Sequence, residues 1–300
     1  MKFLDLAKLG RTSVGLYLGG LALLVILYIL GNLPLLLDIK FNFPELVFDP
    51  ENPAFIANYG TLRLLMGVLF PFVLMFVGML VYLRFAHRRP FLTIFTSATH
   101  FRWKRFFGFG AILVVLFFLF AFAEVTLLGQ TKELTWNFNP DHFFPLLLVA
   151  LVMVPLQAAA EELVFRVYAL QGLYLRTKSA VASILISALL FAFMHISNPE
   201  ISAMGYGLLL YYLMAGIFLA LLSVQDDGLE LALAFHVFNN LFGVLVVSSS
   251  WQVFHTEALF LDQRPPGSLL LHLGSGLFIF TGLYFFLAKK FNWKPLRTLR

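Results

Sequence analysis

The sequence contains no cysteine and few charged residues, and each shortage excludes a class of protein. With no Cys among its 300 residues, the chain has no disulfide, no thiol nucleophile and no Cys-ligated zinc. Only 12% of the residues are charged, whereas a soluble domain carries roughly 25%, and 60% are hydrophobic. No segment carries the clustered basic side chains of a nucleic-acid-binding surface. The composition therefore predicts an integral membrane protein that does not bind nucleic acid.

Several catalytic signatures are also absent. The zinc-binding pattern HExxH, which is typical of a large class of metalloproteases, does not occur. The apolar segments contain no pair of aspartates, and no Ser/Lys or Ser/His pairing stands out in them. Any catalytic centre must therefore be built from other residue types.

Apolar runs long enough to cross a bilayer, about 20 residues each, recur along the whole chain. We predict eight spans, at residues 14–37, 61–84, 107–129, 143–171, 180–196, 203–224, 230–248 and 268–288. Loop 85–106 and the C-terminal tail are basic, whereas loop 38–60 is acidic. Because basic loops mark the cytoplasmic side, the sequence predicts an all-α, multi-pass transmembrane helix bundle in the cell membrane, with N- and C-termini cytoplasmic. The acidic turn Asp226–Asp227 is the one loop that does not fit this orientation.

The predicted spans divide the chain into three regions. Residues 1–142 form an N-terminal region of three spans, in which the basic loop 85–106 is expected to lie at the cytoplasmic interface. Residues 143–248 hold four spans, and residues 249–300 hold the last span and a basic cytoplasmic tail. An ionisable group inside a span is costly unless it is paired or hydrated, so it is a functional candidate by default. Most such groups lie in residues 143–248, which are therefore the predicted catalytic core.

The stretch AAAEELVFRVYAL, residues 158–170, places three charges in an otherwise apolar span. Glu162 and Arg166 are four residues apart, so they share one helical face and can neutralise each other. An ion pair that only stabilises the helix bundle would account for both. Glu161 lies about 100° around the helix and is left without a local partner. A purely structural role therefore leaves Glu161 unexplained.

Two further spans carry polar side chains at the same spacing. Phe191 and His195 are four residues apart in FAFMHISNPE, and His236 and Asn240 are four apart in AFHVFNNLFG. Each taken alone is explained by hydrogen bonds between helices. Taken together, they suggest a site in which a carboxylate acts as general base, a histidine polarises a carbonyl and an amide stabilises an oxyanion. The candidate site residues are Glu161, Glu162, Arg166, His195, His236 and Asn240, and Tyr206, Tyr211 and Tyr212 join them if the sixth span faces the site.

These residues resemble the three motifs of the CPBP family. The motifs read here as Glu161-Glu162-x-x-x-Arg166, Phe191-x-x-x-His195 and His236-x-x-x-Asn240. That family includes the type II CAAX prenyl endopeptidases and the bacterial Abi-type bacteriocin-immunity proteins. The motifs occur in the family's order, each on its own predicted span, and the resemblance covers roughly residues 145–248, about a third of the chain.

The resemblance implies an intramembrane endopeptidase. Glu161 would be the base on the attacking water, with His195 as its partner. His236 and Asn240 would bind the oxyanion or help to place the water. We expect the partners to be the lipid bilayer and a membrane-associated or lipidated peptide or protein substrate. Resemblance to the wider family does not by itself imply recognition of a prenyl group.

The same resemblance gives Glu162 and Arg166 the role of orienting and bracing the site. Two Glu and two His side chains are also a chemically reasonable set of zinc ligands. A water activated by glutamate without a metal needs fewer assumptions. We therefore expect no cofactor, with zinc as the alternative.

Two functions of other classes compete with the peptidase. One is a non-catalytic bacteriocin-immunity or scaffold protein that uses the same fold to bind a partner, and its function would survive Glu161→Gln. The other is a proton-coupled transporter that uses the glutamates and histidines as a relay. A transporter is expected to contain inverted repeats with broken helices in matching halves, and the sequence has no convincing internal repeat.

Overall fold

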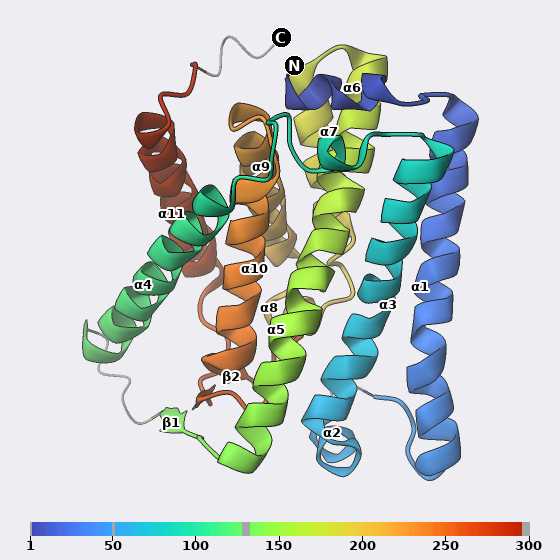
Figure 1. The fold of residues 1–300 in the computed structure, drawn as a ribbon. Coiled ribbons are helices and arrows are strands. Elements are labelled where there is room, and N and C mark those ends of the chain that lie inside the picture. Colours follow the sequence, from blue (N-terminus) through green and yellow to red (C-terminus); the bar gives the residue numbers. More distant parts are fainter. Residues whose placement is uncertain (1, 50–51, 128–132, 296–300) are drawn as a thin grey trace.

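The structure is a computed structural model that describes residues 2–49, 52–127 and 133–295, and it is mostly helical (Figure 1). Residues 128–129 of the predicted span 107–129, and residues 296–300 of the basic tail, lie outside the described residues. The α-helices are α1 (Val14–Asn42), α2 (Pro53–Tyr59), α3 (Thr61–Val81), α4 (Trp103–Leu127), α5 (Pro140–Glu162), α6 (Gln171–Thr177), α7 (Ala180–Phe193), α8 (Pro199–Met204), α9 (Leu209–Gln225), α10 (Glu230–Leu245) and α11 (Leu269–Lys290). The 3₁₀-helices are η1 (Phe3–Leu9), η3 (Phe91–Ile94) and η5 (Tyr206–Leu208), the π-helices are η2 (Tyr82–Ala86) and η4 (Leu163–Leu170), and the strands are β1 (Leu134–Trp136), β2 (Val247–Ser249) and β3 (Phe260–Asp262).

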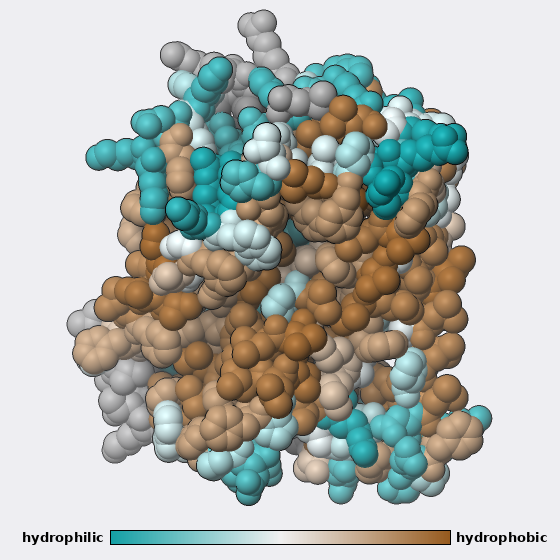
Figure 2. All heavy atoms as spheres, viewed as in Figure 1, coloured by the Kyte–Doolittle hydropathy of each residue, from teal (hydrophilic) through white to brown (hydrophobic). Residues whose placement is uncertain are grey.

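Six helical stretches of the described residues are long and apolar enough to cross a membrane. They are Val14–Asn42, Thr61–Ala86, Trp103–Ala123, Pro140–Thr177, Tyr206–Gln225 and Leu269–Lys290. The predicted spans 180–196 and 230–248 form shorter apolar helices, α7 and α10. Figure 2 shows a broad hydrophobic band across the middle of the molecule, with hydrophilic residues gathered at its two ends. A helical membrane protein is therefore confirmed, whereas eight complete crossings and cytoplasmic termini stay predictions.

The charged stretch begins on α5 and continues into η4, in the middle of the bundle. Helix α5 packs against α3 and α10, and α1 packs against the other side of α3 (Figure 1). Helix α7 packs against α9 and η4. Buried apolar side chains make these contacts, with Leu163 and Val167 in one cluster and Ala158, Phe191 and Phe235 in another. The charges are therefore surrounded by protein rather than by lipid.

Three short strands form a small sheet at the end of the bundle opposite the two termini (Figure 1). Strand β3 lies in the centre, antiparallel to β1 and parallel to β2. The pair Leu134 and Asp262 begins the β1 register, and Val247 and Phe260 begin that of β2. The sequence did not predict this sheet, because strands of three residues give no clear alternation of apolar and polar side chains.

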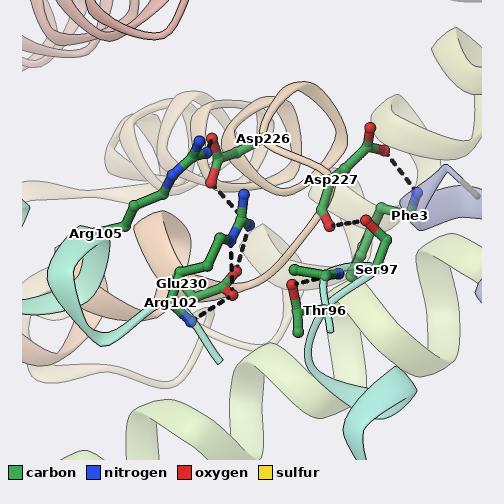
Figure 3. Close-up of polar contacts among 9 residues, drawn as sticks. Phe3, Thr96, Ser97, Arg102, Arg105, Asp226, Asp227 and Glu230 are labelled. Carbon is green, nitrogen blue, oxygen red and sulfur yellow. Dashed lines mark hydrogen bonds and ion pairs between the residues drawn. The ribbon is translucent and has the colours of Figure 1, made fainter. Parts of the chain in front are cut away.

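The acidic turn between α9 and α10 is neutralised by arginines from loop 85–106 (Figure 3). Arg102 donates from Nε to Glu230 Oε1 at 2.9 Å and from Nη2 to Glu230 Oε2 at 2.6 Å. The same Nη2 lies 2.9 Å from Asp226 Oδ2, and Arg105 pairs with the other oxygen of Asp226. The turn that argued against the predicted orientation therefore presents little net negative charge.

The neighbouring Asp227 joins two other segments to this turn (Figure 3). Its Oδ1 accepts the backbone N–H of Phe3 at 2.7 Å, and its carbonyl oxygen accepts the Ser97 hydroxyl at 2.8 Å. Loop 85–106 is thus folded against the helix ends, and its exposed Trp103 remains free to contact a membrane surface. The two termini and this basic loop lie at the same end of the bundle (Figure 1).

Candidate active site

One long helical segment carries both glutamates and the arginine of the first motif. Helix α5 continues into the π-helix η4 directly after Glu162, and η4 continues into α6. Pro155 lies inside α5 and does not end it. A π-helix is wound more widely than an α-helix, and such turns occur frequently at functional sites. The change of winding therefore falls where the charged side chains begin.

Arg166 and Glu162 form the ion pair that their spacing predicts. Arg166 Nε lies 3.3 Å from Glu162 Oε2, and both side chains are completely buried. The guanidinium carbon also lies 4.8 Å from the centre of the Phe191 ring, within cation–π range. A carboxylate buried so completely needs a compensating cation, because its desolvation is otherwise very costly. Arg166 supplies that cation.

His236 connects the two glutamates from the neighbouring helix α10. Its Nδ1 lies 2.9 Å from Glu162 Oε1, and its Nε2 lies 3.8 Å from Glu161 Oε2. Since the carboxylate can only accept, Nδ1 carries the proton and donates it to Glu162. In the neutral imidazole, Nε2 is then an acceptor that faces the second carboxylate. The distance of 3.8 Å is too long for a direct hydrogen bond between these two atoms.

Glu161 has a local partner that the sequence interpretation missed. Gln157, one turn earlier, donates from Nε2 to Glu161 Oε1, so the expectation that Glu161 lacks a local partner was wrong. Gln157 Oε1 in turn accepts Asn240 Nδ2 at 3.0 Å, and Asn239 donates to Asn240 Oδ1 at 3.2 Å. Glu161 Oε2 is buried and has no hydrogen-bond partner among the described residues. The network therefore fixes one oxygen of Glu161 and leaves the other unused.

Sequence spacing contained the signal for Gln157. The residue is four positions before Glu161, the same separation that identified the Glu162–Arg166 pair. Its amide is uncharged, and the prediction for this span rested on the three charged residues, so Gln157 was not included. Gln157 is nevertheless the only side chain, among the described hydrogen bonds, that links the first motif to Asn240 of the third.

His195 lies in the turn after α7 rather than inside a helix. Its Nδ1 donates to the carbonyl oxygen of Phe191 at 2.8 Å, which leaves Nε2 free. The imidazole stacks on the Tyr212 ring with centroids 4.1 Å apart, and the Phe191 ring lies 4.6 Å away on a tilted plane. His195 also interacts electrostatically with Glu161. The contact with Tyr212 confirms that this part of α9 faces the site.

A cavity of about 1790 Å³ brings the motif residues together. Glu162 and Arg166 are completely buried and do not line it. Among the tyrosines of the sixth predicted span, Tyr211 and Tyr212 line the cavity, whereas Tyr206 is 72% exposed and does not. The candidate residues on the cavity wall are Glu161, His195, His236 and Asn240.

The cavity also explains how a site far from the end of its helix is reached. Counting along the helix places Glu161 about 22 Å from Arg176. The segment from Pro140 to Thr177 is continuously helical, so the chain itself offers no shorter path. Gly172 and Arg176 line the same cavity as Glu161. The cavity therefore connects the site with the end of the bundle where the termini lie.

Zinc is the alternative to a metal-free site that the Glu and His residues raise. Among the described residues, no three His, Asp or Glu side chains are grouped closely enough to hold a metal ion. A catalytic zinc usually takes three protein ligands. The Nδ1 atoms of His195 and His236 are engaged by the Phe191 carbonyl and by Glu162, so each histidine has one nitrogen free.

Comparison with known proteins agrees with the motif pattern. A family model described as type II CAAX prenyl endopeptidase Rce1-like matches residues 142–242, a range that includes all six candidate residues. The chain is also 29% identical over 248 residues to the uncharacterized protein YyaK of Bacillus subtilis (strain 168), a match that covers 82% of this chain and 82% of that protein. No solved structure matches the chain. The family match covers about a third of the chain and contains all three motifs, so residues 142–242 are similar to the type II CAAX prenyl endopeptidases, which supports the resemblance to the CPBP family.

Proposed function

We propose that this protein is an intramembrane endopeptidase that hydrolyses a peptide bond with a water activated by Glu161 and His236. One observation carries the proposal: two unpaired acceptors, Glu161 Oε2 and His236 Nε2, face each other at 3.8 Å on the cavity wall. A single water lying beside both atoms would donate one hydrogen to each. Its lone pairs would then point away from the two acceptors, towards a substrate in the cavity.

The groups behind these two acceptors hold them in the reactive state. The Glu162 carboxylate accepts the Nδ1 proton of His236, which fixes the tautomer with a free Nε2. Arg166 keeps Glu162 ionised and therefore an acceptor. Gln157 donates to the other oxygen of Glu161 and thereby fixes the orientation of the carboxylate. Glu162, Arg166 and Gln157 are thus positioning residues in this proposal.

The proposed reaction balances on these side chains. The water oxygen bonds to the scissile carbonyl carbon, and Glu161 takes the water proton. Asn240 has one amide hydrogen that Gln157 does not use, and this hydrogen would stabilise the oxyanion. The C–N bond then breaks, and Glu161 returns its proton to the leaving amine. His195, with Nε2 free, faces the same cavity and is the second group placed to carry a proton.

The walls of the cavity suit a substrate that arrives from the membrane. Helices α1 and α3 contribute apolar side chains, among them Leu21, Val25, Leu69 and Phe72. An apolar or lipidated segment would bury its surface there, while the peptide bond lies near Glu161. We accordingly propose a membrane-associated or lipidated peptide or protein as substrate, and the cell membrane as the location. The reaction as written needs no metal.

The test compares cleavage by purified wild-type protein, Glu161→Gln and the control variant Glu45→Gln. Glu45 is exposed and does not line the cavity, so its substitution removes the same charge without touching the candidate site. A panel of lipidated and unlipidated quenched peptides is incubated with each protein, and new termini are identified by mass spectrometry. We expect cleavage by wild type and Glu45→Gln, and at least about a 100-fold loss in Glu161→Gln. Equal cleavage by all three would refute the proposed base. A protein that protects cells against a bacteriocin regardless of Glu161 would instead support the scaffold alternative.

A further inference from the structure

Arg89 is a buried cation with no carboxylate partner among the described residues. Its side chain is 2% exposed and hydrogen bonds only to neutral acceptors, the Gln171 side chain at 3.0 Å and the Thr93 carbonyl at 2.6 Å. Burial lowers the pKa of Arg89 to about 10, so it remains charged at neutral pH. The other buried arginine of the bundle, Arg166, has a carboxylate beside it. The charge of Arg89 is therefore left uncompensated.

Two buried donors in this cluster also lack acceptors. Arg89 Nε and Gln171 Nε2 have no hydrogen-bond partner among the described residues. Buried donors almost always have a hydrogen-bond acceptor. Two donors without one, beside an uncompensated cation, indicate that a negatively charged acceptor binds nearby. No such group is supplied by the described residues that contact Arg89.

The cluster adjoins the end of the cavity nearest the termini. Tyr17 interacts electrostatically with both Arg89 and Arg176. A Cβ atom on Gly172 would lie 2.5 Å from the Tyr17 ring, so that ring packs directly on the helix backbone beside Gln171. Tyr17, Gly172 and Arg176 line the cavity. Arg89 thus lies behind a cavity mouth that already carries a second arginine.

The three segments around this mouth are strongly basic. Residues 1–12, 82–95 and 168–179 together contain eight Lys or Arg and a single acidic residue, Asp5, which pairs with Lys8. The cations are Lys2, Lys8, Arg11, Arg84, Arg88, Arg89, Arg176 and Lys178. Below the mouth the cavity wall becomes apolar, with Leu21, Leu24 and Val25 of α1. A charged mouth above an apolar wall matches a molecule with an anionic head and a hydrocarbon tail.

We propose that the mouth formed by Tyr17, Gly172 and Arg176, with Arg89 behind it, binds the phosphate group of an anionic phospholipid. The phosphate oxygens accept from Arg176 at the mouth, the buried charge of Arg89 attracts them from behind it, and an acyl chain lies along α1. Basic pockets between membrane helices on the cytoplasmic side bind lipid head groups by this chemistry. The head-group site lies at the mouth of the cavity rather than beside Glu161, and its acyl chain would share the α1 wall with the proposed substrate. Binding of the phosphate does not depend on the proposed peptidase activity.

Native mass spectrometry of the detergent-solubilised protein tests the proposal. Wild type, Arg89→Gln and Arg176→Gln are each incubated with phosphatidylglycerol, with phosphatidylcholine and with inorganic phosphate. Arg88→Gln is the matched control, since Arg88 is the exposed neighbour of Arg89 and loses the same charge. Arg176 would donate to the phosphate and Arg89 lies directly behind it, whereas Arg88 only adds an exposed charge and makes no contact in the proposed site. We therefore expect about a fivefold or greater loss of phosphatidylglycerol affinity in Arg89→Gln and in Arg176→Gln, and less than about a twofold loss in Arg88→Gln.

Each outcome decides the question. The lipid site is supported if wild type and Arg88→Gln bind phosphatidylglycerol more tightly than phosphatidylcholine, and if Arg89→Gln or Arg176→Gln removes this preference. If inorganic phosphate competes with phosphatidylglycerol and binds with equal affinity, the same atoms form a site for free phosphate instead. Equal retention of both lipids by wild type, or equal losses in the Arg88 and Arg176 variants, overturns the proposal. The Arg176 variant keeps the test valid if Arg89→Gln does not fold, because Arg176 is exposed.

Discussion

Replacing Arg166 by alanine should be among the most destabilising single changes in this protein. The substitution leaves Glu162 buried at 0% exposure with His236 as its remaining polar contact. Removing one partner of a buried ion pair costs roughly 3–5 kcal/mol. The lost contact of the guanidinium with the Phe191 ring adds up to about 2 kcal/mol at a desolvated site. We therefore expect Arg166→Ala to lower the free energy of unfolding by at least about 3 kcal/mol.

The double variant Glu162→Gln with Arg166→Met separates the ion pair from simple loss of packing. The introduced glutamine would still accept the His236 proton, and the methionine would fill most of the arginine volume, so we expect a loss of only about 1–2 kcal/mol. Arg63→Ala is the surface control, because Arg63 is 47% exposed in its pair with Asp38 and such pairs contribute about 0–1 kcal/mol. Equilibrium unfolding in mixed micelles with increasing dodecyl sulfate measures all three. The reasoning is refuted if Arg166→Ala costs no more than Arg63→Ala, or if the double variant is as unstable as the single one.

Three other contacts lead to predictions of their own. Gln157→Leu removes the hydrogen bond that orients Glu161, and a hydrogen bond to a charged group contributes about 1.5–3 kcal/mol. Peptide cleavage should therefore slow roughly 10- to 100-fold, while the free energy of unfolding changes less. Unchanged cleavage would contradict the positioning role. Burial lowers the pKa of His87 in the folded protein, so stability should be full above about pH 6.5 and fall as the pH drops below it, and a His87→Phe variant should lose that part of the pH dependence in unfolding curves. Glu230→Gln leaves Arg102 without its bidentate partner at a partly exposed site, and it should lower the free energy of unfolding by about 2 kcal/mol. Thermal unfolding measures this loss, and a change below about 0.5 kcal/mol would contradict the prediction.

The helices of this fold could be predicted from the sequence because long apolar runs have few alternatives in a bilayer. Apolar length alone did not indicate that α7 and α10 are the two shorter apolar helices, which end at Phe193 and Leu245. Pro199 starts a new helix soon after α7, and the chain after α10 enters the small sheet. That sheet joins Leu134 to Asp262, residues far apart in the chain, and pairing of this kind depends on the finished bundle.

The candidate site was predictable where its contacts are local. The separation of four residues correctly paired Glu162 with Arg166, and the same rule applied to an amide would have found Gln157. Contacts between helices were not predictable, because they depend on how α5 and α10 are rotated against each other. Spacing along one helix could not indicate that His236 donates to Glu162. The stacking of His195 on a tyrosine of α9 likewise required the packed structure.

Hydrolysis in oxygen-18 water tests the central proposal, activation of water by Glu161, most directly. Wild type and Glu161→Gln are purified, treated with a strong chelator and incubated with a cleaved peptide from the panel under single-turnover conditions. We predict that chelated wild type releases a product with one heavy oxygen in its new carboxylate, and that Glu161→Gln releases at least about 100-fold less. Cleavage that is lost with chelator and restored by zinc would contradict the account and make the same residues metal ligands, and undiminished cleavage by Glu161→Gln would remove Glu161 from the chemistry.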